Sequence, residues 1–261
     1  MPTVEPIFAH AVPLLLVVTR LGGLFMFTPL LANRSAPRRV RATLALVFGA
    51  ALYAGVPAIS QTPPETDLLG LLPLAAGELL IGVALGFIAA MPLFALDLAG
   101  YLIGHQMGLG LGRVYNPELD SDADVTSQLL MYLGLGVFVA MGGLEAAFLS
   151  LAATFEHLPP GAFRLDALPL DAVVSVLAGG FDLALRVAAP ALGIILLVMI
   201  ALGFIMKSMP QINVLSIGFT IKILCGVGVV AVSLWAMQQA AGDEIGRALG
   251  IADTWARELR P

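Results

Sequence analysis

The stretch from residue 68 to residue 112, "LLGLLPLAAGELLIGVALGFIAAMPLFALDLAGYLIGHQMGLGLG", decides the fold class of this chain. It contains no lysine or arginine, and its only acidic residues are Glu78 and Asp97. A helix that crosses a bilayer needs about 20 mainly apolar residues, so this stretch is longer than one crossing requires. Because Pro73 and Pro92 interrupt it, the stretch predicts either one long kinked helix or a helical hairpin.

The same apolar pattern recurs along the chain and predicts an all-α fold of membrane-associated helical hairpins with long kinked helices. Segment 170–206, with Pro190 inside, is also overlong and leaves the same two alternatives open. The chain is 59% hydrophobic and 12% charged, with a mean hydropathy of +0.96, whereas soluble domains carry about 25% charged residues. We expect about six apolar elements in a single domain over residues 1–261: 8–31, 40–59, 68–112, 128–155, 170–206 and 214–237.

The connections between these elements carry an orientation signal. Residues 34–41 hold four arginines, and the positive-inside rule places such a loop in the cytoplasm. Residues 60–67 hold no lysine or arginine and are expected on the opposite side. The N-terminal run lacks the basic start of a signal peptide, so we expect it to be retained.

The C-terminal stretch differs from the apolar segments before it. Over residues 238–261, apolar side chains recur at helical spacing with charges between them, which predicts an amphipathic helix. Such a helix would lie at the membrane interface or dock on a neighbouring protein. The apolar positions are Ile245, Leu249, Ala252, Trp255 and Leu259.

Residues 104–125, "GHQMGLGLGRVYNPELDSDADV", resemble a ligand loop but fail on spacing. The glycines match neither phosphate-binding pattern, and no Lys-Ser or Lys-Thr follows them. Counted from Asp120, the sixth and twelfth positions of a calcium loop hold Val125 and Met131 instead of glycine and glutamate. We expect a solvated acidic turn that caps a helix starting near Gln128, with three candidate capping residues: Asp124, Thr126 and Ser127.

No residue pattern indicates catalysis, a metal or a cofactor. His10, His105 and His157 are far apart, and Cys225 is a single cysteine in an apolar run, where a small buried hydrophobe is its expected role. No basic patch interleaved with aromatic residues indicates nucleic-acid binding. We therefore expect a protein that is not an enzyme, holds no cofactor and binds no nucleic acid.

Glycines at every fourth position predict close packing of helices. Gly100, Gly104, Gly108 and Gly112 follow Gly82 and Gly86 at the same step. In an apolar helix this spacing places the missing side chains on one face, where another helix of this chain or of a partner can approach closely.

Ionisable side chains inside the apolar segments are the other exception to the pattern, because each is costly in lipid and should face protein, water or the membrane interface. Asp182 and Arg186 are four residues apart, which suits an ion pair on one helix face. Two interpretations remain open, namely assembly contacts and the proton or ion relay of a transporter. The residues are Arg20, Glu78, Asp97, Asp182, Arg186, Lys207 and Lys222.

Three stretches together resemble the flagellar biosynthetic protein FliR family, the R subunit of the type III export gate, whose injectisome counterpart is SctT. They are "TRLGGLFMFTPLLANRSAPRRVRATLAL" at residues 19–46, "GHQMGLGL" at 104–111 and "MPQINVLSIGFTIKILCGV" at 209–227. The resemblance covers nearly the whole chain. Its most specific parts are two turns, which it implies are assembly turns: Pro37, Arg38, Arg39 and Arg41, and Pro210, Gln211 and Asn213.

The resemblance implies a structural and gating role in the bacterial inner membrane, within the flagellar basal body. The implied partners are the FliP and FliQ export-gate subunits, the switch protein FlhB, membrane lipid and the unfolded flagellar proteins that pass through the gate. The alternative hypothesis, from a different class, is a self-contained ion-coupled transporter with Glu78, Asp97 or Asp182 in a relay.

The resemblance also implies a pore plug at residues 108–117. Relatives run from glycine through small apolar and aromatic residues to Asp-Pro, and this chain departs from them after Gly112. The glycines allow bends, the apolar side chains are suited to fill a narrow passage, and the proline stops a continuing helix. The residues are Gly108, Leu109, Gly110, Leu111, Gly112, Arg113, Val114, Tyr115, Asn116 and Pro117.

Overall fold

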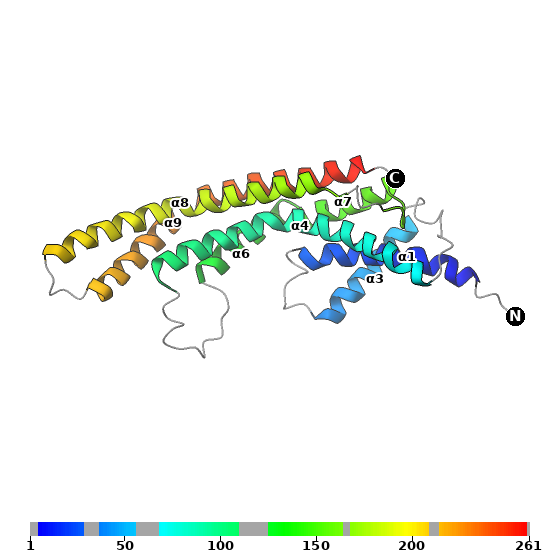
Figure 1. Cartoon of the computed structure of the whole chain (residues 1–261), viewed down its shortest axis with the longest axis horizontal. Helices are drawn as coiled ribbons and strands as arrows, with labels where there is room; N and C mark the ends of the chain where they lie inside the picture. Colours follow the sequence, from blue (N-terminus) through cyan, green and yellow to red (C-terminus); the bar gives the residue numbers. More distant parts are fainter. Residues whose placement is uncertain are drawn as a thin grey trace. The chain divides into compact units, whose positions relative to one another are not determined.

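A computed structural model of the chain describes residues 5–28, 37–55, 68–109, 125–163, 168–208 and 214–259, and all regular structure in these ranges is helical. The prediction of an all-α fold is therefore confirmed. The helices, labelled in Figure 1, are α1 (Glu5–Phe27), α3 (Arg38–Gly55), α4 (Leu68–Met107), α6 (Val125–Ala140), α7 (Gly143–His157), α8 (Leu170–Ser208) and α9 (Val214–Glu258).

The two overlong segments are each one continuous helix, not a hairpin. Helix α4 has 40 residues and α8 has 39, which at 1.5 Å per residue makes each about 60 Å long, twice the apolar thickness of a bilayer. Among the described residues, α1, α4, α8 and α9 are long and apolar enough to cross a membrane, and α6 with α7 would make a fifth crossing. This agrees with the expected number of apolar elements.

The expected single element at residues 128–155 is wrong, because the structure divides it into α6 and α7. The division falls at Met141 and Gly142, and Gly142 has a φ of 70°. Glycine adopts this left-handed conformation without the steric cost that a side chain brings. The Gly142 amide donates to the Val139 carbonyl at 3.0 Å, and the Gly142 carbonyl accepts from Ala146 at 2.9 Å, so one residue ends the first helix and starts the second.

The C-terminal stretch is not a separate helix but the end of the 45-residue α9. No proline stands between residues 238 and 258, and the single glycines there are tolerated within a helix at a cost of about 1 kcal/mol each. The expected apolar face exists, since Ile245, Ala252 and Leu259 are buried within the chain itself. Its place at a membrane interface stays a prediction.

The chain divides into two compact units, each assembled from distant parts of the sequence. Unit 1 comprises Met1–Met91, Val139–Leu177 and Ile245–Pro261, and unit 2 comprises Pro92–Phe138 and Ala178–Glu244. In unit 1, side chains of α1, α4 and α7 form the core, among them Leu21, Ile81 and Leu151, none of which is exposed. In unit 2, α4, α6, α8 and α9 contribute to one apolar cluster. That the whole chain forms one domain stays a prediction.

Candidate functional site

Helices α1 and α4 meet backbone to backbone in unit 1. A Cβ atom on Gly82 of α4 would overlap the carbonyl oxygen of Arg20, and one on Gly86 would lie 2.7 Å from the carbonyl oxygen of Leu24. A Cβ on Gly23 of α1 would overlap the backbone of α4 in return. Gly82 and Gly86 therefore pack against a helix of the same chain. The contribution of α1 was not predicted, because adjacent glycines such as Gly22 and Gly23 show no four-residue repeat.

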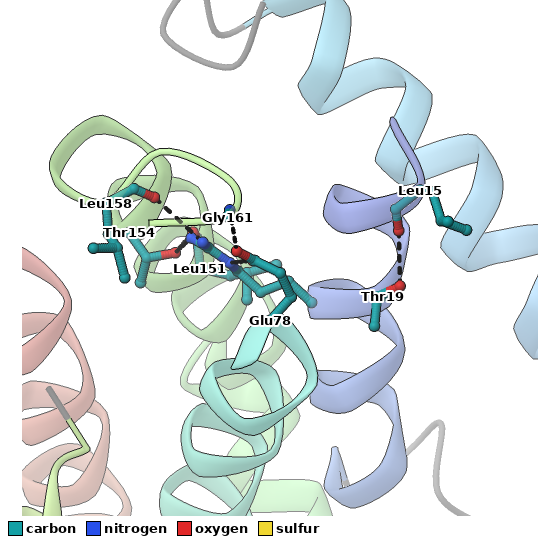
Figure 2. A network of polar contacts seen from close by, with 8 residues as sticks. Leu15, Thr19, Glu78, Leu151, Thr154, Leu158 and Gly161 are labelled. Carbon is teal, nitrogen blue, oxygen red and sulfur yellow. Dashed lines mark hydrogen bonds and ion pairs between the residues drawn. The ribbon is translucent and has the colours of Figure 1, made fainter. Parts of the chain in front are cut away.

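The same contact holds a buried ion pair. Arg20 of α1 and Glu78 of α4 are both 0% exposed, and Arg20 Nε donates to Glu78 Oε2 at 2.5 Å. The second carboxylate oxygen, Oε1, accepts from the backbone amide of Gly161 at 2.8 Å. Figure 2 shows Glu78 reaching from α4 toward the turn after α7, with the dashed line to Gly161.

The Arg20 guanidinium also connects α1 to α7 by hydrogen bonds. It donates to Thr154 Oγ1 at 2.8 Å and to the carbonyl oxygen of Leu158 at 3.2 Å, and it lies 4.1 Å from the centre of the Phe155 ring. Thr154 Oγ1 in turn donates to the Leu151 carbonyl at 2.6 Å (Figure 2). We call these contacts, together with that between Glu78 and Gly161, the Arg20–Glu78 network. Among the described residues, every buried side-chain nitrogen and oxygen has a hydrogen-bond partner.

In unit 2, α4 ends in a turn built on Gly108. Its φ is 87°, its amide donates to the His105 carbonyl, and the Leu109 amide donates to the Gly104 carbonyl, each at 3.1 Å. This pairing is the Schellman motif, which satisfies the last carbonyls of a helix when a left-handed residue follows it. Leu109 packs against the unit 2 cluster. Gly108 thus lies beyond the last residue of α4, so the four-residue glycine spacing continues past the end of the helix.

Gly100 of α4 lies against the first turn of α6. A Cβ there would come 2.5 Å from the Cα of Ser127. Ser127 Oγ donates to the Asp97 carbonyl at 2.9 Å and also contacts the Asp97 carboxylate. Helix α6 starts at Val125, three residues before the expected start near Gln128, so Thr126 and Ser127 lie inside its first turn and are not its cap, and Ser127 bonds to α4. Asp124, the third candidate cap, lies outside the described residues.

A family model described as "Bacterial export proteins, family 1" matches residues 11–248. The chain belongs to this family. Flagellar biosynthetic protein FliR of Escherichia coli is 30% identical over 212 residues, which cover 81% of this chain and 80% of the relative. FliR of Aquifex aeolicus is 28% identical, covering 80% and 81%. Secretion system apparatus protein SsaT of Salmonella typhimurium is 29% identical, covering 58% and 59%.

The family match spans the Arg20–Glu78 network and the end of α4, but most of the expected plug lies outside the described residues. Only Gly108 and Leu109 of the plug are described. Residues 110–117, which include Gly112 of the glycine spacing, are not, and neither are Asp120 to Asp124 of the acidic turn. The plug of this family member stays a prediction.

The first expected assembly turn of this family member forms the start of a helix. The Pro37 carbonyl accepts from the amides of Val40 and Arg41 at 2.9 and 3.3 Å, so Pro37 precedes the first turn of α3 and Arg38, Arg39 and Arg41 belong to that turn. The second turn, with Pro210, Gln211 and Asn213, lies outside the described residues. An assembly role for either turn stays a prediction.

The remaining ionisable residues of the apolar segments are exposed or half-buried: Asp182, Arg186 and Lys207 are exposed, and Asp97 and Lys222 are half-buried. Asp182 and Arg186 form the expected ion pair on α8, with both side chains 64% exposed. No group of three or more His, Cys, Asp or Glu in the described ranges is arranged to hold a metal ion. The sequence did not predict the roles of Thr154, Phe155 and Gly161. Nothing in the sequence around Thr154 indicates that it binds Arg20, which is 134 positions away.

Proposed function

We propose that this member of the bacterial export protein family is a structural and gating subunit of a flagellar type III protein export gate, with no enzymatic activity of its own. It would act in the inner membrane at the flagellar basal body, together with FliP- and FliQ-type subunits and FlhB. The observation that carries the proposal is the family match over residues 11–248, joined to the apolar surface that α8 and α9 leave uncovered.

Helices α8 and α9 support the proposed assembly. Only 11% of the most apolar window of α8 and 17% of that of α9 are buried within the chain, against 61% for α4. Their exposed side chains include large ones such as Phe204, Leu197 and Trp235. Large exposed apolar surfaces mark places that a membrane or a protein partner covers. Both helices are also longer than the roughly 30 Å apolar thickness of a bilayer, so lipid alone cannot cover them.

The end of α4 supports the position proposed for the plug. The Schellman turn at Gly108 stops the helix, and Leu109 anchors the start of the following segment on the unit 2 cluster. A segment held at its first residue can occupy a passage without moving the helix before it. In this proposal residues 108–117 fill the closed gate, and the contact of Gly100 with the first turn of α6 holds these two helices together.

The proposed plug is tested by deleting residues 110–116 in cells that carry the assembled gate. The ion leak through the closed gate should rise, because the segment that fills the passage is shortened, while the yield of assembled complex should stay near that of the unaltered protein. The matched control deletes seven residues of the acidic turn, 118–124, and should raise the leak less. Leak is followed by salt sensitivity and by conductance of the purified complex.

Two results would contradict the proposal. An unchanged leak from a fully assembled complex would remove the plug assignment. A chain that is stable alone in detergent, associates with no other export protein and takes up a solute in vesicles would favour the self-contained ion-coupled transporter.

A further inference from the structure

Arg20 and Glu78 bring two charges into an apolar interior, where a single charge would be strongly destabilising. Each is 0% exposed, and each lies in a helix apolar enough to span a membrane. Ionisable residues in such positions commonly mark proton or ion pathways. The question is whether Glu78 could carry protons or has another use.

Both carboxylate oxygens of Glu78 bind groups of the protein itself. Oε2 accepts from Arg20 and Oε1 accepts from the Gly161 amide, so both oxygens are acceptors of donors that the protein supplies. Accepting on both oxygens suits the ionised carboxylate. Glu78 is also 0% exposed, so a proton would have to cross the surrounding helices to reach it.

The contacts of Arg20 point to the use of the pair. Its guanidinium donates to the hydroxyl of Thr154, in the last turn of α7, and to the carbonyl oxygen of Leu158, the residue that follows the helix. Glu78 holds the amide of Gly161, three residues further on. The turn after α7 is therefore held at two points. Arg20 of α1 binds the Leu158 carbonyl, and Glu78 of α4 binds the Gly161 amide.

We propose that Arg20 and Glu78 are positioning residues: a charge-neutral pair that fixes α1, α4 and the turn after α7 in one arrangement within the isolated chain, and that Glu78 is not part of a proton relay. The network closes on groups of this chain alone, so it forms without a partner subunit. The inference goes beyond the proposed function and depends on it only for the export measurement described below.

The test compares removal of one charge with removal of both. Arg20→Met keeps the apolar stem of the side chain, and Glu78→Gln keeps an oxygen that can accept from Gly161. Each single variant leaves one buried charge unpaired, and we expect the protease-resistant fraction of the full chain in detergent to fall at least about tenfold. The double variant leaves no unpaired charge and should recover to within about threefold of the unaltered chain.

The exposed pair on α8 is the matched control. Asp182→Asn and Arg186→Met also break an ion pair, but both partners are 64% exposed. Because exposed pairs contribute little, the same measurement should change less than about twofold for either variant. If breaking the exposed pair has the same effect as breaking the buried one, burial is not what makes the Arg20–Glu78 pair matter.

The second measurement separates positioning from proton transfer. In cells, the folded double variant should export flagellar proteins with the same dependence on external pH as the unaltered protein. A double variant that folds and assembles but has lost export, or that shifts its pH dependence, would overturn the proposal in favour of a relay. Single variants as stable as the unaltered chain, or a double variant as unstable as the singles, would overturn it as well. The stability results hold whether or not the proposed export function is right.

Discussion

The buried ion pair of unit 1 and the exposed ion pair on α8 in unit 2 lie in different surroundings. In unit 1 the Arg20–Glu78 pair is fully enclosed and glycines bring α1 and α4 into backbone contact. In unit 2 the Asp182–Arg186 pair is 64% exposed, and large apolar side chains such as Phe204, 71% exposed, face outward. The difference teaches that the Arg20–Glu78 pair is satisfied by residues of unit 1, whereas α8 in unit 2 presents large apolar side chains that something else must cover.

The largest effect expected from this comparison concerns adjacent glycines of α1. Gly23→Ala should destabilise the chain by roughly 3 kcal/mol or more, because its Cβ would overlap the α4 backbone, which has no rotamer to change. Gly22→Ala is the matched control. Nothing lies within 4 Å of its Cβ position, and alanine favours the helix by up to about 1 kcal/mol. Thermal unfolding in detergent measures both, and equal Tm values would break the account of unit 1.

A smaller effect is expected at the end of α4 in unit 2. Gly108→Ala should destabilise the turn by about 1–2 kcal/mol, because a side chain is strained at a φ of 87°. Gly228→Ala on α9, where nothing lies within 4 Å, is the control and should not lower stability. Thermal unfolding again gives the comparison. If Gly108→Ala unfolds at the same temperature as its control, the left-handed turn does not contribute as described.

The smallest effect on the isolated chain is expected on the uncovered surface of α8. Leu197→Asn with Phe204→Asn should change the stability of the isolated chain by no more than about 0.5 kcal/mol per site, because neither side chain packs in a core. A fall in Tm as large as that of Gly23→Ala would show that this surface is buried within the chain after all.

Apolar length was enough to predict where the helices lie, since α4 and α8 come from long runs with few charged residues. It left open whether each run is one helix or a hairpin, and the structure shows one helix in each case. The break between α6 and α7 was not predicted, because a left-handed Gly142 looks in the sequence like any other glycine of an apolar helix. The charges Arg20 and Glu78 were identified as costly, but their pairing over 58 positions depends on how α1 meets α4. Tertiary geometry of this kind leaves no periodic trace in the sequence.

The central claim is that this chain is an assembly subunit whose unit 2 surface is covered by partners, and co-purification tests it most directly. The full chain, co-expressed with the FliP- and FliQ-type proteins of its own organism and purified in mild detergent, should be recovered in one complex with them. The variant with Leu197→Asn and Phe204→Asn should fold and yet be recovered without them. A chain that is always recovered alone and monodisperse, with or without these substitutions, would contradict the claim.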